Sequence, residues 1–88
     1  TPTLWLRCGP NPFRGSLSVT YPDGLEGDTR VEVYDTGGRL LRTLSGVSST
    51  SVIWDGRSHS GEPVPEGVYV IRLVAEGTTA SRRVTLLR

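Results

Sequence analysis

Residues 54–69, WDGRSHSGEPVPEGVY, hold the densest group of turn-forming residues in this chain. Strand-forming sequences flank them, because residues 50–54 precede the stretch and residues 68–75 form the longest β-branched and aromatic run. Asp55 and Gly56 favour a turn at its start. Two prolines near its end fix φ and bias the residues before them toward extended backbone. The sequence therefore predicts a long, ordered loop between two strands.

An aromatic residue stands at each end of this loop. Trp54 and Tyr69 are expected to point into one core, since large aromatic side chains dominate the energetics of burial. Phe13 is expected to act as an apolar plug near the start of the chain. The residues predicted to carry the structural motif are Pro12, Phe13, Trp54, Asp55, Gly56, Gly61, Gly67 and Tyr69.

The loop also carries oxygen atoms of the kind that bind calcium or magnesium, on Asp55, Ser58, Ser60 and Glu62. The Asp-x-Asp-x-Asp-Gly pattern of a dedicated calcium loop is missing, so the structural interpretation is favoured. His59 has no second His or paired Cys to join it as a ligand, and we expect it to be solvated. The sequence thus predicts no metal and no cofactor.

Composition favours a single all-β domain. The 88 residues suffice for one core, and 11 Gly and 6 Pro indicate short strands with frequent turns. The net charge is only +1, and the basic residues, all of them arginine, are scattered until the C-terminal end, which argues against nucleic-acid binding. No apolar run reaches membrane-spanning length, so no membrane insertion is expected.

The sequence contains no Met, so we expect residues 1–88 to be one domain excised or processed from a longer secreted protein. Cys8 is the single cysteine, which excludes an internal disulfide. We expect Cys8 to be buried as a small apolar residue, with an intermolecular bridge as the minor alternative.

Alternation of apolar and polar residues, interrupted by turn signals, predicts seven strands. We place them at residues 3–8, 16–21, 30–35, 39–44, 50–54, 68–75 and 81–88. A hairpin turn is expected at residues 36–38, and further connections at 22–29, 45–49 and 76–79. This spacing predicts an all-β, seven-stranded antiparallel β-sandwich of the immunoglobulin or fibronectin III type. Its expected core includes Trp54, Tyr69, Leu73, Val84 and Leu86.

Several motifs, taken in order, resemble two related bacterial families. The motifs are PNPF at 10–13, VYD at 33–35, GRL at 38–40, WDGR at 54–57 with Gly61, Val64-Pro65, Gly67 and Tyr69, and RRVTLL at 82–87. Together they resemble the C-terminal sorting domains of the type IX secretion system. They resemble equally the immunoglobulin-like domain of the flagellar hook-capping protein. The resemblance extends from residue 10 to residue 88.

The resemblance to sorting domains implies a C-terminal module of an exported protein that an outer-membrane translocon recognises. Sorting domains commonly carry Lys in or near the last strand, whereas this chain has Arg there, which keeps the charge but not the amine chemistry. The implied partners are the outer-membrane secretion machinery and the upstream domains of the parent chain. The residues implied in recognition are Arg82, Arg83, Leu86, Leu87 and Arg88.

We therefore expect a non-catalytic, monomeric sorting and surface-attachment domain, secreted to the cell surface. The sequence argues against an enzyme, because it shows no catalytic triad pattern, phosphate-binding Gly loop or metal cluster. One alternative is a structural spacer or assembly domain, like that of the hook-capping protein. The other is a carbohydrate-binding module, which would gain support if Trp5 and Tyr34 were exposed on one sheet face. Its stacking residues would come from Trp5, Tyr21, Tyr34, Trp54 and Tyr69.

Overall fold

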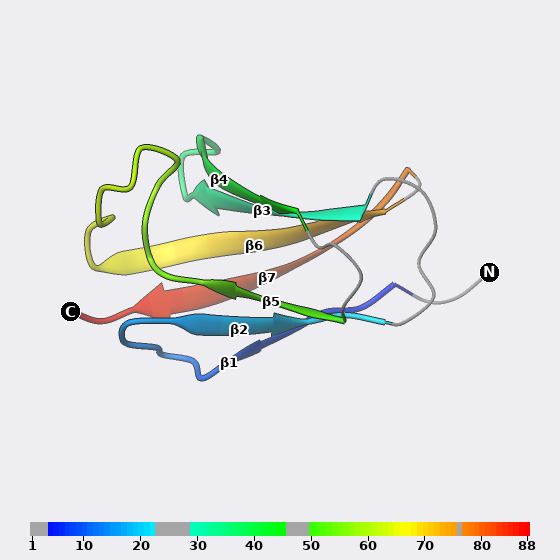
Figure 1. The fold of residues 1–88 in the computed structure, drawn as a ribbon, viewed down its shortest axis with the longest axis horizontal. Coiled ribbons are helices and arrows are strands. Elements are labelled where there is room, and N and C mark those ends of the chain that lie inside the picture. Colours follow the sequence, from blue (N-terminus) through cyan, green and yellow to red (C-terminus); the bar gives the residue numbers. More distant parts are fainter. Residues whose placement is uncertain (1–3, 23–28, 46–49, 76) are drawn as a thin grey trace.

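The computed structural model describes residues 4–22, 29–45, 50–75 and 77–88. Within them the chain forms two β-sheets that pack face to face (Figure 1). The described residues contain no helix, and their seven strands are β1 (Arg7–Gly9), β2 (Leu17–Thr20), β3 (Thr29–Asp35), β4 (Leu40–Ser45), β5 (Ser51–Trp54), β6 (Gly67–Ala75) and β7 (Thr78–Leu86). This confirms the predicted all-β, seven-stranded sandwich of the immunoglobulin-like type.

Every strand pair in the described part of the chain is antiparallel. One sheet has the strand order β1, β2, β5, and the other has the order β4, β3, β6, β7. The chain enters at one end of the sandwich before β1 and leaves at the opposite end after β7 (Figure 1). This path places β7 at the edge of its sheet, close to β1 of the other sheet.

The hairpin predicted at residues 36–38 joins β3 to β4. The Asp35 carboxylate accepts hydrogen bonds from the N–H groups of Gly37 at 3.0 Å and Arg39 at 2.9 Å. Gly38 has a φ of 87°, a conformation that glycine adopts without strain. The short polar side chain of Asp35 therefore fixes the turn that the Gly-Gly sequence allows.

Most predicted strand boundaries differ from the structure by one residue, and the larger differences lie in the first and last strands. The sequence predicts a first strand at 3–8, of which residue 3 lies outside the described residues, but β1 begins only at Arg7 and the residues from Leu4 to Leu6 lead into it. The sequence predicts a connection at 76–79 and a last strand at 81–88, but Thr78 and Thr79 already pair with β6, and β7 ends at Leu86. Gly77 has a φ of 76°, which permits a tight connection and lets the strand start early.

The core confirms the predicted inward positions. Trp54 is completely buried, with its ring centroid 5.6 Å from that of Phe13 and 5.5 Å from that of Tyr69. These tilted and edge-on arrangements suit the quadrupoles of aromatic rings. Leu73, Val84 and Leu86, all expected in the core, are buried around them.

The loop between β5 and β6 is bound to this core along its length. The Asp55 carboxylate accepts a hydrogen bond from the Arg57 N–H at 3.1 Å, as the sequence predicted. The buried Trp54 indole donates to the Arg57 carbonyl at 2.9 Å, and the Tyr69 hydroxyl donates to the Pro65 carbonyl. The loop is therefore held by the same two aromatic residues that stand at its ends.

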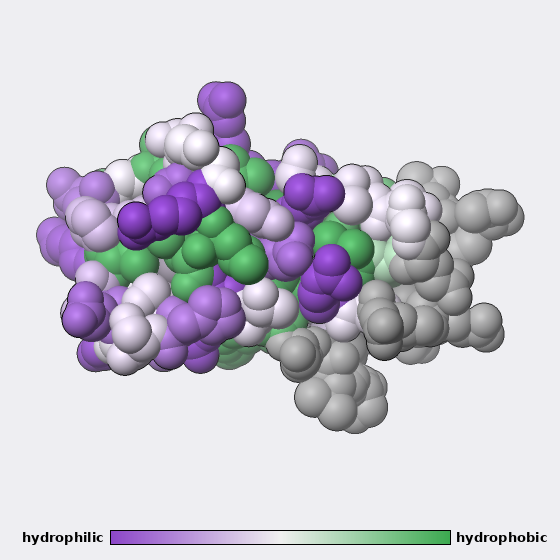
Figure 2. Space-filling model, turned by 90° about the horizontal axis from the view of Figure 1, so that it is seen from above, coloured by the Kyte–Doolittle hydropathy of each residue, from purple (hydrophilic) through white to green (hydrophobic). Residues whose placement is uncertain are grey.

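Large apolar side chains are also exposed at several separate positions. Trp5 precedes β1, whereas Leu40, Ile53 and Val68 lie on β4, β5 and β6. One face of the molecule shows apolar residues gathered over its middle with polar residues around them (Figure 2). The described residues contain no helix that is long and apolar enough to cross a membrane. The connections predicted at residues 22–29 and 45–49 fall largely outside the described residues.

Replacing Trp54 with Ala should lower the free energy of unfolding by about 3 to 5 kcal/mol, because it leaves a cavity in the centre of the core. The matched control is Trp5→Ala, since Trp5 is 40% exposed and its ring lies 5.6 Å from the Arg7 guanidinium carbon. That change should cost below about 1 kcal/mol. Urea unfolding followed by Tyr fluorescence or circular dichroism measures both. Equal losses in the two variants would contradict the assigned core.

Candidate functional site

The residues implied in recognition lie along β7 and just after it. Val84 and Leu86 face the core and are buried, whereas Arg83 and Thr85 face outward from the sheet. Leu86 is completely buried and therefore cannot be touched by a partner without unfolding the domain. Because β7 ends at Leu86, the half-buried Leu87 and the following Arg88 continue beyond the strand.

Arg82 bridges the two sheets at their edge. It pairs with the buried Ile71 of β6, so its side chain leaves the inner face of the sheet although it is exposed. Its guanidinium Nε donates a hydrogen bond to the Leu6 carbonyl at 3.2 Å. Arg82 and Arg83 therefore point to opposite faces of the same strand.

The C-terminal half of the β7 edge is closed by residues 11–13. The Phe13 N–H donates to the Thr85 carbonyl at 2.8 Å, and the Leu87 N–H donates to the Phe13 carbonyl at 2.9 Å. The Asn11 side chain accepts a hydrogen bond from the Thr85 N–H at 2.9 Å and donates one to the Arg83 carbonyl at 3.4 Å. Asn11 thus acts as one residue of a neighbouring strand, and Pro12, which has no N–H, joins it to Phe13.

Arg88 turns back onto the loop between β5 and β6. Its guanidinium donates to the Val64 carbonyl, at 2.6 Å from Nη2 and 3.1 Å from Nε, and to the Gly56 carbonyl at 3.0 Å. Its backbone N–H donates to the Glu66 carboxylate at 2.9 Å. Nothing in the local sequence signals these contacts, because their partners lie more than twenty positions away. Arg88 therefore holds the loop between β5 and β6 against the end of β7, and we call these contacts of Arg88 the loop latch.

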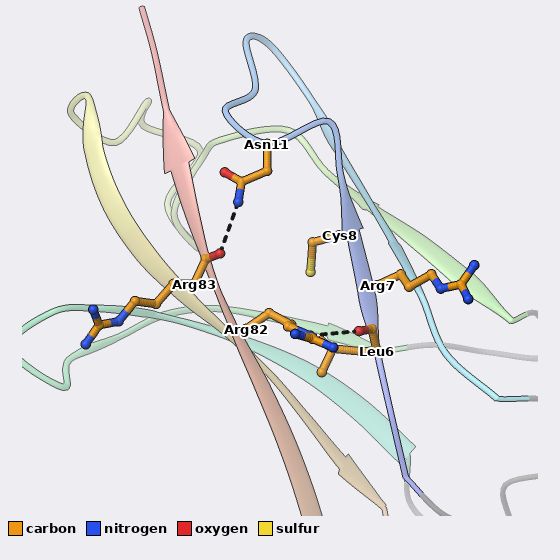
Figure 3. A pocket seen from close by; sticks show the side chains of 6 residues that line it. All are labelled: Leu6, Arg7, Cys8, Asn11, Arg82 and Arg83. Carbon is orange, nitrogen blue, oxygen red and sulfur yellow. Dashed lines mark hydrogen bonds between the residues drawn. The ribbon is translucent and has the colours of Figure 1, made fainter.

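A pocket of about 420 Å³ separates β1 from β7 (Figure 3). In Figure 3 the Arg82 side chain crosses this pocket toward Leu6, whereas the guanidinium groups of Arg7 and Arg83 point away from it on opposite sides. The described residues that line it are Leu6, Arg7, Cys8, Asn11, Arg82 and Arg83, and none of them is acidic. The rim of the pocket is therefore positively charged.

Cys8 lies at the floor of this pocket but is half-buried rather than fully buried as expected. Burial raises the pKa of the Cys8 thiol to about 11, although the nearby Arg82 acts in the opposite direction. The thiol is therefore protonated at neutral pH and is a poor nucleophile. Cys8 contributes an apolar wall and no negative charge.

The four-stranded sheet carries a buried carboxylate, that of Glu32 on β3, on its outer face. Glu32 is only 8% exposed and accepts hydrogen bonds from Arg30 Nε at 3.0 Å and from the Tyr34 hydroxyl at 2.8 Å. Burial raises the pKa of Glu32, but these hydrogen bonds and the charges of Arg30 and Arg72 outweigh it and lower the pKa overall. The carboxylate is therefore ionised at neutral pH and serves as the acceptor that holds this network.

The network also bears on the carbohydrate-binding alternative. The Arg72 guanidinium carbon lies 5.9 Å from the centroid of the Tyr34 ring, on the sheet that contains β3 and β6. Trp5 precedes β1 of the opposite sheet, and Tyr21, Trp54 and Tyr69 are buried. The described aromatic residues thus do not form the shared exposed platform that this alternative requires.

Three of the four side chains in the alternative cation loop, those of Asp55, Ser58 and Ser60, already have partners. Asp55 contacts Arg42 Nη1 at 3.3 Å, and the hydroxyls of Ser58 and Ser60 lie 2.9 Å apart. His59 is exposed, and its backbone N–H donates to the Leu41 carbonyl at 3.0 Å. Among the residues that the structure describes, no group of three or more His, Cys, Asp or Glu side chains is placed to hold a metal ion.

The two antiparallel sheets and the core between them define an immunoglobulin-like domain as the class to compare. The sequence profile of the FlgD Ig-like domain matches residues 13–79. The chain therefore belongs to the FlgD Ig-like domain family. No curated protein sequence matches the chain.

Two solved structures from Porphyromonas gingivalis are similar to this domain. PorZ, described as an essential bacterial surface component of the type IX secretion system, is 27% identical with a TM-score of 0.70 over 97% of this chain. Dimeric latent PorU is 24% identical with a TM-score of 0.77 over 93% of this chain, a likeness of fold alone. The chain spans only 11% of PorZ and 9% of PorU.

Replacing Arg88 with Ala should destabilise the domain by about 1 to 3 kcal/mol, because the Gly56 and Val64 carbonyls lose a charged donor. Arg14→Ala is the control, since Arg14 is exposed and its side chain makes no hydrogen bond or ion pair in the described residues. Thermal unfolding of both variants tests the latch. A melting temperature of the Arg88 variant equal to that of the Arg14 variant would show that the latch contributes nothing.

Proposed function

We propose that this domain is a non-catalytic sorting and surface-attachment module of an exported protein, recognised by the outer-membrane machinery of type IX secretion. The likeness to PorZ, itself a surface component of that system, supports the proposal. The proposed location is therefore the cell surface, reached by secretion.

The observation that carries the proposal is the pair of exposed arginines on an edge strand. Arg82 and Arg83 lie on β7, where no further strand of the sheet covers them in the described part of the chain. Charges on an edge strand also discourage unwanted pairing, so their presence alone fits a purely structural role. Of the five residues implied in recognition, Leu86 is buried and Arg88 binds the loop, which leaves Arg82, Arg83 and Leu87 for contact.

A structural spacer or assembly domain is the second candidate function. The family is named for the Ig-like domain of FlgD, which supports this alternative directly. The course of the chain supports it as well, because entry and exit lie at opposite ends of the sandwich and suit a domain strung between others (Figure 1). In this role the arginines of β7 would have no translocon to contact.

A reporter fusion in a host with type IX secretion distinguishes the two functions. The variant Arg82→Gln with Arg83→Gln removes both edge charges and keeps the buried residues. The control, Arg14→Gln with Arg39→Gln, removes two exposed charges away from β7. We expect the wild type and the control to reach the cell surface and the β7 variant to stay in the periplasm, after thermal melting has shown that all three fold.

Export of the folded β7 variant at the wild-type level would contradict the role of these arginines. Retention of the wild-type fusion itself would contradict sorting altogether and favour the spacer. The fraction of reporter accessible to external protease gives the readout in each case.

A further inference from the structure

In the described residues, no strand other than β6 pairs with the N-terminal half of β7, which we call its open edge. The N–H and the carbonyl of Thr85 both bond to residues 11–13, so they point away from β6. Backbone groups in a strand repeat their direction every two residues, so those of Thr79, Ser81 and Arg83 point away from β6 as well. In the described residues, β7 pairs over 79–82 with β6 alone. In the part of the chain that the structure describes, the exposed Thr79 and Ser81 thus present unpaired backbone groups at this edge.

One end of the open edge, at Arg82 and Arg83, lines the pocket between β7 and β1. The pocket volume of about 420 Å³ lies within the roughly 300 to 1,000 Å³ typical of ligand sites. Asn11 also lines the pocket, and its side chain already bonds to β7 as a neighbouring strand would. A segment entering the pocket would therefore continue the pairing that Asn11 begins.

The charges around the pocket indicate what kind of segment fits. Arg82 and Arg83 leave opposite faces of β7, and the guanidinium groups of Arg7 and Arg83 diverge (Figure 3). A single small anion cannot meet groups that diverge in this way. An added strand alternates its side chains in the same manner as β7, so two adjacent acidic residues on it would face Arg82 and Arg83 separately.

A second copy of this chain fits the edge poorly. Pairing of two β7 edges would bring two Arg82 and two Arg83 side chains into one short interface. The described lining of the pocket supplies no acidic residue to compensate them. Like charges on neighbouring strands are destabilising, so the edge resists self-association.

We propose that the open half of β7, Thr79 to Arg83, binds an extended acidic segment of a protein partner as an additional strand. Backbone hydrogen bonds supply the affinity, and Arg82 and Arg83 select a pair of adjacent acidic residues. The proposed strand addition is the contact that the sorting role would use. It depends on that role only for the location of the partner, because strand addition is measured on the isolated domain.

The probe is the synthetic peptide acetyl-TVEEVT-amide, titrated into the ¹⁵N-labelled domain. We expect amide chemical shift changes concentrated at Thr79, Ser81 and Arg83. Replacing the two Glu of the peptide with Gln should weaken binding at least fivefold. A peptide N-methylated at alternate residues, which loses the donors on one edge, should not bind.

Ser81→Pro is the decisive variant. The Ser81 N–H points away from β6, so proline removes a donor that the β6 ladder does not use, a position where edge strands tolerate proline. The variant should retain the wild-type melting temperature within a few degrees and lose peptide binding. Arg83→Gln should weaken binding at least fivefold, and the control Arg39→Gln should leave it unchanged.

Three outcomes would overturn the proposal. Peptide binding that survives Ser81→Pro would indicate contacts through side chains alone. An absence of shift changes at millimolar peptide would show that the edge accepts no such strand. Concentration-dependent dimerisation that Ser81→Pro abolishes would identify a second copy as the occupant.

The export experiment separates this inference from the proposed function. If the peptide binds but the fusion lacking Arg82 and Arg83 is exported normally, strand addition is supported and sorting through these residues is contradicted. If that fusion is retained but no peptide binds, sorting is supported and strand addition is contradicted.

Discussion

The burial of the Trp54 ring is the contact on which the rest of this domain depends. The ring packs between Phe13 and Tyr69, and its indole N–H binds the Arg57 carbonyl inside the following loop. One side chain therefore fills the centre of the core and also fixes the start of the loop. Tyr69 does the same at the loop's other end through its hydroxyl.

The same contact determines the state of the sheet edge. Phe13 is buried against Trp54, and this places its backbone beside β7, where it bonds to Thr85 and Leu87. Asn11 then extends the pairing by its side chain. Arg88, just past β7, returns to the loop that Trp54 anchors. Core, loop and half of the last strand's edge thus form one connected unit, and the other half is left for a partner.

The sequence predicted what depends on local patterns. Alternation in β2, β3, β6 and β7 identified the buried side chains, and the Asp-Gly and Gly-Gly pairs identified turns that the structure contains. The sequence predicts the start of β7 too late, because Thr78 and Thr79 stand beside Gly77 in a turn-like context although β-branched threonines favour strands.

The contacts that define the site depend on residues far apart in the chain. Asn11 meets Thr85 across 74 positions, and Arg88 meets Gly56 across 32. A polar side chain that replaces a strand residue, or an arginine that bonds to loop carbonyls, leaves no periodic signal in the sequence. Glu32 is similar, because alternation places it on the outer face, and only the side chains of Arg30 and Tyr34 make it buried.

Amide hydrogen exchange along β7 tests the central claim most directly, because the claim concerns which backbone N–H groups are already bonded. We predict that the amides of Thr85 and Leu87 are protected by Asn11 and Phe13 and exchange slowly. The amides of Thr79 and Ser81 should exchange many times faster, although they lie in the same strand. Equal protection of all four amides, or rapid exchange at Thr85 and Leu87, would contradict an edge that is half closed and half open.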